Sequence, residues 1–418
     1  MRVKFYKRNK FRLLLWITLM TTQATVMAQT IYQWRGPERS GIYPESGLLK
    51  SWPQNGPELL WSAEMIGNGF AAPVVTPEKL FINGEMEGMS FLFAFDLKGK
   101  LLWKSPNGAE FTGSGYASSF PGARSTPTVI GDLVYSMSGK GRLACFEVLS
   151  GKEKWAVELV KDLKGLDSEF GFAESPLIDG ELVFCMPGGP VNNVVALNRF
   201  TGKQVWTSKA LGDTTSFTSP QLVVLPTRKL LVTLSRHYIF AVDTKNGELL
   251  WSQKLLNYRY DGEHCNTPVF ANGMLYYNAA DENGNGMVKL ELSPDGKSIR
   301  ELWRTKDAAN GFGGFVVSIG HVFLANAKKQ LIALEIGGGK VVTTLRPASG
   351  SVVMSGNRLY VYNDNGDMKL IAFENNAFSE ISKFKVNKGS KEHFSHPVIA
   401  GGVLYIRHGN ALMAYKIK

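Results

Sequence analysis

Cysteine is scarce in this chain of 418 residues, which contains three and no two close together. Cys145 and Cys185 lie in apolar, strand-like segments, where a thiol packs as a small hydrophobic group. Cys265 lies in a polar segment and is the exception. A thiolate metal site needs several neighbouring cysteines, so we expect none here.

Acidic residues are absent before Glu38, whereas six Lys and Arg residues precede residue 13. These six account for much of the net charge of +11 and leave +5, too little to indicate a nucleic-acid partner. An apolar run at residues 13–20 and the small-residue ending Val-Met-Ala at residues 26–28 follow. This order is typical of a secretory signal peptide over residues 1–28, which leaves a single domain over residues 29–418.

Long hydrophobic segments are also lacking. The run at residues 13–20 is short for a bilayer span, and no later stretch is apolar enough for one. No cysteine near Ala28 could carry a lipid. We therefore expect a periplasmic or secreted protein with no transmembrane segment after signal cleavage, and an uncleaved N-terminal anchor is the alternative.

Tryptophan, in contrast, recurs at regular intervals. Six Trp residues are spaced 42, 52, 51, 45 and 52 residues apart, and most end a phrase of the form Ala-x-Asp, Gly-Lys or Gly-Glu turn, apolar residues, Trp. They are Trp61, Trp103, Trp155, Trp206, Trp251 and Trp303. A period of about 40–50 residues built from short strands and turns predicts a β-propeller.

Each repeat opens with a strand that begins at Pro or, in two repeats, at Val. The eight starting residues are Pro73, Pro127, Pro176, Pro220, Pro268, Val316, Val352 and Pro397. Proline is tolerated at the first residue of a strand, where its missing N–H matters least. We therefore predict an all-β fold, an eight-bladed propeller of four-stranded blades. Seven blades is the alternative, because the repeat at Val352 is short and has no Trp.

The last repeat stops at Lys418, after its third strand. A strand-like segment at residues 58–61 precedes the first repeat and belongs to none. We expect this N-terminal strand to complete the last blade, which closes the ring and removes exposed sheet edges.

The repeated Gly-Lys-x-x-Trp phrases, with Gln-Trp-Arg-Gly-Pro at residues 33–37 and Arg-Ser-Gly at residues 39–41, resemble the PQQ-like (quinoprotein-like) β-propeller repeat family, in its exported branch. Residues 122–127 and 173–176 are similar too. That family includes bacterial alcohol dehydrogenases and the outer-membrane assembly lipoprotein. The resemblance implies the propeller fold, with Trp side chains docked between blades.

The dehydrogenases of this family use pyrroloquinoline quinone (PQQ) and Ca²⁺ beside an adjacent Cys-Cys pair. This chain has no such pair and no Cys-x-x-Cys-His haem motif. We therefore disfavour PQQ-dependent oxidation and leave the cofactor unassigned. The Asp- and Asn-rich segments at residues 281–286 and 363–367 are interpreted as hairpin tips rather than Ca²⁺ loops, since position twelve of the first is Leu292.

Propeller ligands bind where the loops that enter the innermost strands converge, so the residues just before the repeat starts are the candidates. The polar ones are Arg124, Glu174, Glu263, His264, His393 and His396. Together they could bind an anionic or metal-bridged ligand or perform acid–base chemistry. The alternative is a structural ring in which Arg124 pairs with Glu174 across two blades.

Three functions fit this sequence. The first is a non-catalytic exported propeller that binds a small molecule or a protein partner at its axial face. The second is a quinone- or metal-dependent oxidoreductase that uses the same funnel. The third is a scaffold for outer-membrane assembly, against which the missing lipid-attachment cysteine counts. Neither a Ser-His-Asp spacing nor a His-Glu-x-x-His motif is present.

Overall fold

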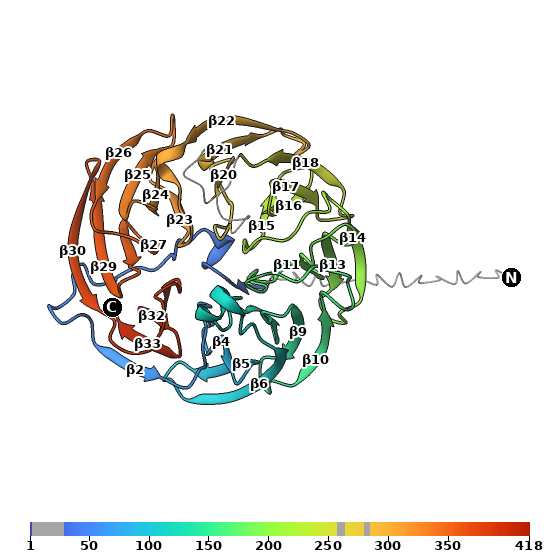
Figure 1. The fold of residues 1–418 in the computed structure, drawn as a ribbon, viewed down its shortest axis with the longest axis horizontal. Coiled ribbons are helices and arrows are strands. Elements are labelled where there is room, and N and C mark those ends of the chain that lie inside the picture. The colour runs from blue at the N-terminus through green and yellow to red at the C-terminus, as the bar shows by residue number, and fades with distance from the viewer. Residues whose placement is uncertain (2–28, 257–263, 280–284) are drawn as a thin grey trace.

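The computed structural model describes Met1 and residues 29–256, 264–279 and 285–418. Eight antiparallel sheets stand side by side in a ring around a central axis (Figure 1). The eight-bladed propeller is therefore confirmed, and the seven-blade alternative is wrong. The signal peptide predicted over residues 1–28 lies, apart from Met1, outside the described residues.

The first four blades follow the chain in order. Blade 1 comprises β3 (Val74–Val75), β4 (Lys79–Met86), β5 (Met89–Asp96) and β6 (Leu101–Ala109). Blade 2 comprises β7 (Thr128–Ile130), β8 (Leu133–Met137), β9 (Arg142–Glu147) and β10 (Glu153–Glu158). Blade 3 comprises β11 (Leu177–Asp179), β12 (Leu182–Cys185), β13 (Val194–Asn198) and β14 (Gln204–Ser208). Blade 4 comprises β15 (Gln221–Val224), β16 (Lys229–Leu234), β17 (Tyr238–Asp243) and β18 (Leu249–Lys254).

The remaining blades continue round the ring. Blade 5 comprises β19 (Val269–Ala271), β20 (Met274–Ala279), β21 (Gly286–Leu292) and β22 (Ile299–Thr305). Blade 6 comprises β23 (Phe315–Ser318), β24 (His321–Asn326), β25 (Gln330–Glu335) and β26 (Val341–Leu345). Blade 7 comprises β27 (Ser351–Ser355), β28 (Arg358–Tyr362), β29 (Asp367–Glu374) and β30 (Ala377–Lys385). Blade 8 comprises β31 (Val398–Ala400), β32 (Val403–His408), β33 (Ala411–Lys416) and the N-terminal β2 (Leu59–Ala63).

Blade 8 closes the ring as the sequence predicted. Strand β2 pairs antiparallel with β33, with Leu59 opposite Tyr415 and Ala63 opposite Leu412. Each innermost strand begins within one residue of the predicted repeat start, for example β11 directly after Pro176. The described residues also contain three short 3-10 helices: η1 (Pro37–Arg39), η2 (Gly115–Ser119) and η3 (Lys306–Ala308). No helix in this part of the chain is long and apolar enough to cross a membrane.

Five of the six repeated Trp residues donate a hydrogen bond from one blade to the next, whereas the indole N–H of Trp251 has no partner among the described residues. Trp155 in β10 of blade 2 donates its indole N–H to the carbonyl of Arg199 in blade 3, at 2.9 Å. Gly202 lies against that ring with a φ of 70°, and a Cβ there would sit 2.7 Å from Trp155. The same bond to the next blade recurs at Trp61, Trp103, Trp206 and Trp303. The Gly-Lys-x-x-Trp phrase therefore encodes both halves of the blade interface.

The hydrophobic core is divided among the blade interfaces. One buried cluster unites Cys145 of blade 2 with Cys185 of blade 3, and another unites Trp251 of blade 4 with Tyr277 of blade 5. Both thiols are buried among apolar side chains, as their surroundings in the sequence predicted. Because no single blade buries its faces alone, the ring is the stable unit.

The segment before β2 runs through the middle of the ring (Figure 1, blue). Strand β1 (Ile31–Tyr32) pairs antiparallel with the innermost strand β7 and gives blade 2 a fifth strand. Helix η1 follows at the axis, and Ile42 then forms a parallel bridge with Met354 of β27. The path of this segment through the ring was not predicted, because the segment has no strand periodicity.

Candidate functional site

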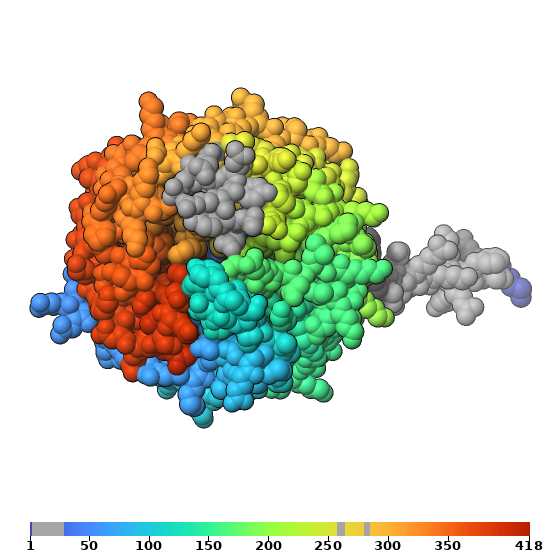
Figure 2. All heavy atoms as spheres, in the orientation of Figure 1, coloured from blue at the N-terminus to red at the C-terminus, as the bar shows by residue number. Residues whose placement is uncertain are grey.

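A cavity of about 330 Å³, which we call the aromatic cup, opens near the axis. Seven of its lining residues occupy one repeat position, three residues before the Pro or Val that starts a repeat: Phe70, Arg124, Ala173, Phe217, Cys265, Gly313 and Phe394. The space-filling view down the axis shows the face on which η2 (teal) lies near the centre (Figure 2). Seven of the eight repeats thus contribute to one cavity.

The cup is predominantly aromatic. Phe394 is in contact with three other rings, at centroid distances of 5.4 Å to Phe70, 6.4 Å to Phe120 and 4.4 Å to Phe312. On another side, Phe170 meets Phe217 edge to face at 6.1 Å. Rings arranged in this way offer flat apolar faces to a ligand.

The N-terminal segment contributes Trp34 to the cup. The indole N–H of Trp34 donates to the hydroxyl of Thr267 at 3.1 Å, and its ring meets the edge of His396 at 4.3 Å. Thr267 and His396 each stand directly before an innermost strand, in blades 5 and 8. Trp34 is therefore held by two blades as part of the cup lining.

Arg39, from the same segment, is 1% exposed and anchors η1 to blades 3 and 4. Its guanidinium donates to the carbonyls of Ser175 at 3.0 Å, Pro176 at 2.6 Å and Pro220 at 3.0 Å. Burial lowers the pKa of Arg39 to about 9, and the charge of Glu174 opposes this shift. Arg39 thus stays charged at neutral pH and adds positive potential next to Ser175, which lines the cup.

Arg124 is the candidate that the structure places most clearly in the cup lining. It donates to the carbonyls of Phe120 at 2.5 Å and Gly122 at 2.8 Å, and its guanidinium lies over the ring of Phe111 at 4.6 Å. Burial lowers its pKa to about 10, against the charge of Glu110. The expected ion pair with Glu174 is not among those of the described residues, and Glu110 is the acid that acts on Arg124.

Glu174 does not line the cup. It is 1% exposed, and its Oε1 accepts the backbone N–H of Met186 at 2.8 Å. Its Oε2 has no hydrogen-bond partner among the described residues. Burial raises the pKa of Glu174 to about 7, which the Met186 N–H and the charge of Arg39 partly offset. This carboxyl therefore belongs to the buried surroundings of Arg39.

Of the predicted histidines, only His396 lines the cup. His264 is buried, and its Nε2 lies 3.2 Å from the carbonyl of Arg236; burial lowers its pKa to about 4. His393 stacks on His408 at 3.7 Å, and burial followed by the charge of His408 lowers the pKa of His393 to about 4. Glu263 lies outside the described residues. The polar candidates are thus brought together only in part.

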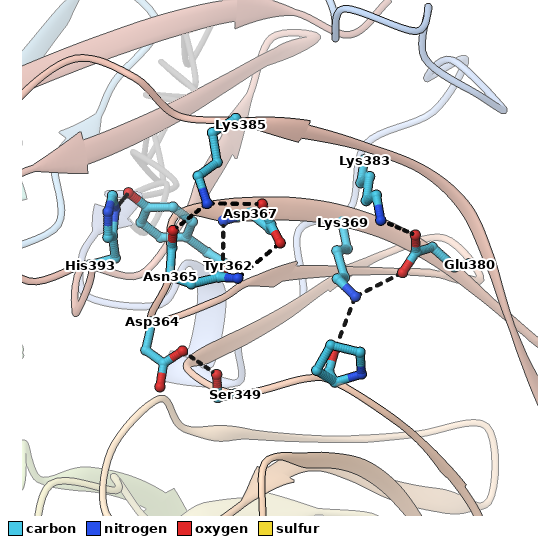
Figure 3. Close-up of polar contacts among 11 residues, drawn as sticks. Ser349, Tyr362, Asp364, Asn365, Asp367, Lys369, Glu380, Lys383, Lys385 and His393 are labelled. Carbon is cyan, nitrogen blue, oxygen red and sulfur yellow. Dashed lines mark hydrogen bonds and ion pairs between the residues drawn. The ribbon is translucent and has the colours of Figure 1, made fainter.

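The hairpin tip at residues 363–367 is satisfied internally (Figure 3). Asn365 and Asp367 bond to each other, and the ammonium of Lys385 contacts Asp367 at 3.3 Å and the Asn365 carbonyl at 2.6 Å. Asp364 accepts the hydroxyl of Ser349 at 2.6 Å. The ammonium of Lys385 therefore balances the negative charge of Asp367. The loop at 281–286 lies mostly outside the described residues.

The aromatic character of the site was missed by reasoning from the sequence. That reasoning selected polar residues before four of the eight repeat starts, whereas Phe70, Phe217 and Phe394 lie three residues before three of the starts. Their equal offset from Pro was a readable signal. The contribution of Trp34, Arg35 and Arg39 was not readable, because it depends on the path of the N-terminal segment through the ring.

Comparisons with known proteins agree with this fold. The family model described as outer membrane protein assembly factor BamB matches residues 88–345. A curated relative, the uncharacterized protein RP232 of Rickettsia prowazekii (strain Madrid E), is 20% identical over 260 residues. That match spans 51% of this chain and 60% of the relative, so less than two thirds of the relative is covered.

Two solved structures are similar at low sequence identity. BamB from Moraxella catarrhalis is 15% identical with a TM-score of 0.61, over 86% of this chain and 98% of that chain. A europium-containing methanol dehydrogenase is 10% identical with a TM-score of 0.54, over 91% and 90% of the two chains. At such identities the likeness shows a shared fold.

Proposed function

The chain belongs to the family described as outer membrane protein assembly factor BamB, and from this premise we propose that it is an exported propeller that binds a small ligand in the aromatic cup. The observation that carries the proposal is the cup itself. Seven repeats of the ring direct the same sequence position into one cavity of about 330 Å³. A concave site of this size, mostly apolar with a few polar groups, is typical of small-molecule binding.

The charges around the cup favour an anionic ligand. None of the described lining residues is acidic, whereas Arg124 is among them. Arg35, Arg39 and Arg407 are buried nearby in the ring, and the acids that act on this group are Glu110 and Glu174. Arginines outnumber carboxylates, so a flat aromatic body with a carboxylate fits both the rings and the potential.

The cofactor set of the quinoprotein dehydrogenases does not fit this cup. Calcium takes six to eight oxygen ligands, chiefly carboxylates and carbonyls. The described lining residues include no carboxylate and no side-chain amide. No group of three His, Cys, Asp or Glu residues suited to a metal occurs in the described part of the chain. We therefore derive no oxidation step and propose binding alone.

Binding can be tested with two probes, naphthoate and the uncharged naphthalene, by calorimetry on the chain without residues 1–28. We expect naphthoate to bind more tightly, because its carboxylate meets Arg124. Arg124→Met should weaken naphthoate at least about tenfold and leave naphthalene within about twofold, since a charge-assisted hydrogen bond contributes about 1.5–3 kcal/mol. Phe394→Ala should weaken both probes about tenfold or more.

Matched controls are available on the outside of the ring. Arg300→Met alters a side chain that is 70% exposed, and Phe200→Ala alters one that is 42% exposed. Both controls should bind the two probes as the unmodified chain does. Equal affinity of all variants for naphthoate would place the ligand elsewhere and overturn the proposal.

Export is part of the same proposal and has its own test. The cationic start, apolar run and small-residue ending over residues 1–28 support it. Expression of the full chain in a bacterial host should yield a periplasmic protein whose N-terminus is Gln29. Retention in the cytoplasm with Met1 intact would contradict export and would leave the binding test unaffected.

A second candidate function is contact with a protein partner during outer membrane protein assembly, which the family description suggests. The observation that favours it is the exposure of large aromatics at the cup, 76% at Tyr116 and 41% at Phe312. Replacing both by Ser should lower outer membrane protein levels in the native host, whereas Arg300→Met should leave those levels unchanged. Unchanged levels would remove this candidate.

A further inference from the structure

We propose that Arg35 is a positioning residue for ligand recognition: it locks neutral His396 in the tautomer with its proton on Nε2, so that the cup selects ligands that accept a hydrogen bond. The inference rests on the proposed function for its binding consequence. The tautomer itself is a property of the free protein and is testable without any ligand.

The first step concerns the bond between the two side chains. Arg35 Nη1 lies 2.9 Å from His396 Nδ1. A guanidinium has five N–H donors and no acceptor. Nδ1 must therefore accept the bond through its lone pair, and in a neutral ring the only N–H is then on Nε2.

The second step is that Arg35 has no freedom to release this bond. It is 2% exposed, and it also donates to the carbonyls of Phe315 at 2.6 Å and Val352 at 3.2 Å. The absence of a side chain at Gly314 and Gly41 leaves space for the Arg35 guanidinium. A Cβ at Gly314 would clash with Nη1 at 2.2 Å, and a Cβ at Gly41 would clash with Nη2 at 2.1 Å. Arg35 is thus held by blades 6 and 7 while it contacts His396 of blade 8.

The third step is that His396 stays neutral. It is 6% exposed, and burial followed by the charge of Arg35 keeps its pKa well below the ordinary value. The ring also meets Trp34 edge-on, a group that does not titrate. An imidazolium at this position would direct a second N–H at the guanidinium, which cannot accept it.

The fourth step concerns what His396 offers to the cup. His396 lines the cup, and Nε2 makes no hydrogen bond with any other described residue. Ser175 and Ser219 also line it, and each hydroxyl oxygen already accepts a backbone N–H, from Thr126 and Ser175 respectively. Their hydroxyl hydrogens remain available. Nε2–H and these two hydroxyl hydrogens are therefore donors that a ligand can meet, and a ligand atom that bonds to His396 must accept.

The tautomer can be measured by long-range nitrogen–proton NMR on histidine-labelled protein, with His396→Gln used to assign the ring among six histidines. We expect only the Nε2–H tautomer in the unmodified chain. Arg35→Met should produce a mixture of both tautomers, and Arg35→Lys, which keeps a donor, should restore the single form. An Nδ1–H ring in the unmodified chain, or a single Nε2–H form in Arg35→Met, would overturn the inference.

The selectivity can be measured with two neutral probes of similar size: quinoline, whose ring nitrogen accepts, and indole, whose N–H donates. Quinoline should bind the unmodified chain about tenfold more tightly than indole, as one hydrogen bond gained against one donor left unpaired implies. In Arg35→Met the ratio should fall to about twofold. Equal affinities in the unmodified chain, together with a single tautomer, would overturn the selectivity. Failure of both probes to bind would count against the proposed function instead, and the NMR result would still decide the tautomer.

Discussion

At the scale of single residues, the charges near the axis are held mainly by backbone carbonyls. Arg407 is fully buried and donates to the carbonyls of Asn83 at 2.5 Å and Gly67 at 3.0 Å, as Arg39 does to three carbonyls of blades 3 and 4. A buried charge is tolerated when its hydrogen bonds are satisfied. The innermost strands have carbonyls to spare at their starts, because Pro and loop residues there form no complete ladder.

Glu174 should make the stability of the protein depend on pH. Burial raises its pKa to about 7 from an ordinary value of 4.5. Between these two values the folded chain retains a proton that the unfolded chain has lost, so the free energy of unfolding falls as the pH rises through this window. Glu174→Gln should remove that fall and gain at most about 3 kcal/mol over the unmodified chain above the window.

The measurement is urea denaturation at about pH 5 and about pH 8. Glu78→Gln is the matched control, because the side chain of Glu78 is 82% exposed. The control should keep the pH dependence of the unmodified chain. Identical pH dependence in both variants would mean that Glu174 is ionised in the folded protein throughout the window.

At the scale of elements, three features characterise the repeat. They are the residue that starts the innermost strand, the glycine of the turn, and the Trp side chain that packs against the next blade. Pro at the start of an innermost strand has no ladder bond to lose there. Glycine in the Gly-Lys turn supplies a positive φ and the space for the Trp of the preceding blade, as Gly202 does for Trp155. These three residues fix where a strand begins and which neighbour it packs against.

Substitution of two glycines can distinguish the cost of backbone strain from the cost of contact with an indole ring. Gly202 and Gly180 both have positive φ, at 70° and 57°, but a Cβ at Gly180 meets nothing within 4 Å. Gly180→Ala should cost about 1–2 kcal/mol for the left-handed backbone. Gly202→Ala should cost a further 1–3 kcal/mol for displacing Trp155. Chemical denaturation of both variants checks this, and equal losses would show that the ring of Trp155 moves aside freely.

At the scale of the whole molecule, two parts of the N-terminal region complete the ring. Strand β2 supplies the outer strand of blade 8, and the preceding segment fills the axis between the innermost strands (Figure 1). Tyr43 of that segment is buried, and its backbone N–H donates to the carbonyl of Met354 at 2.8 Å. Removing residues 29–63 would therefore open both the edge and the centre of the propeller.

The closing interface should stabilise the ring as much as an internal one does. Trp61 of β2 bonds to the Leu97 carbonyl of blade 1 at 2.9 Å, as Trp155 bonds to Arg199. Trp61→Ala and Trp155→Ala should each cost about 3–5 kcal/mol and leave a single unfolding transition. Urea denaturation followed by two spectroscopic probes checks both points. A near-neutral Trp61→Ala would mean that blades 8 and 1 hold together without this indole.

Much of the architecture could be predicted, because a propeller repeats its local rules. The eight repeat starts follow from a pattern that recurs about every 50 residues. The closure by residues 58–61 was inferred from the strand missing in the last repeat, and the docking of the Trp residues was implied by the family resemblance. Of the residues predicted for a site, only some line the cup, and their role in binding stays a prediction. Arg124 and His396 line the cup, whereas Glu174, His264 and His393 do not. A loop position indicates which end of the ring a residue occupies, but the direction of its side chain depends on neighbouring blades.

By itself, the sequence determined the strand pattern and the repeat, since both depend on turn residues and apolar spacing close together along the chain. It predicted eight blades and closure by residues 58–61, with seven blades left as the alternative, and the structure confirmed eight blades and the pairing of β2 with β33. Only the tertiary structure decided that Trp34, Arg35 and Arg39 enter the axis and that phenylalanines from several blades meet in one cup. Those contacts join residues as far apart as 361 positions, as between Arg35 and His396. Such pairs leave no periodic trace, because they are specified by the shape of the assembled ring.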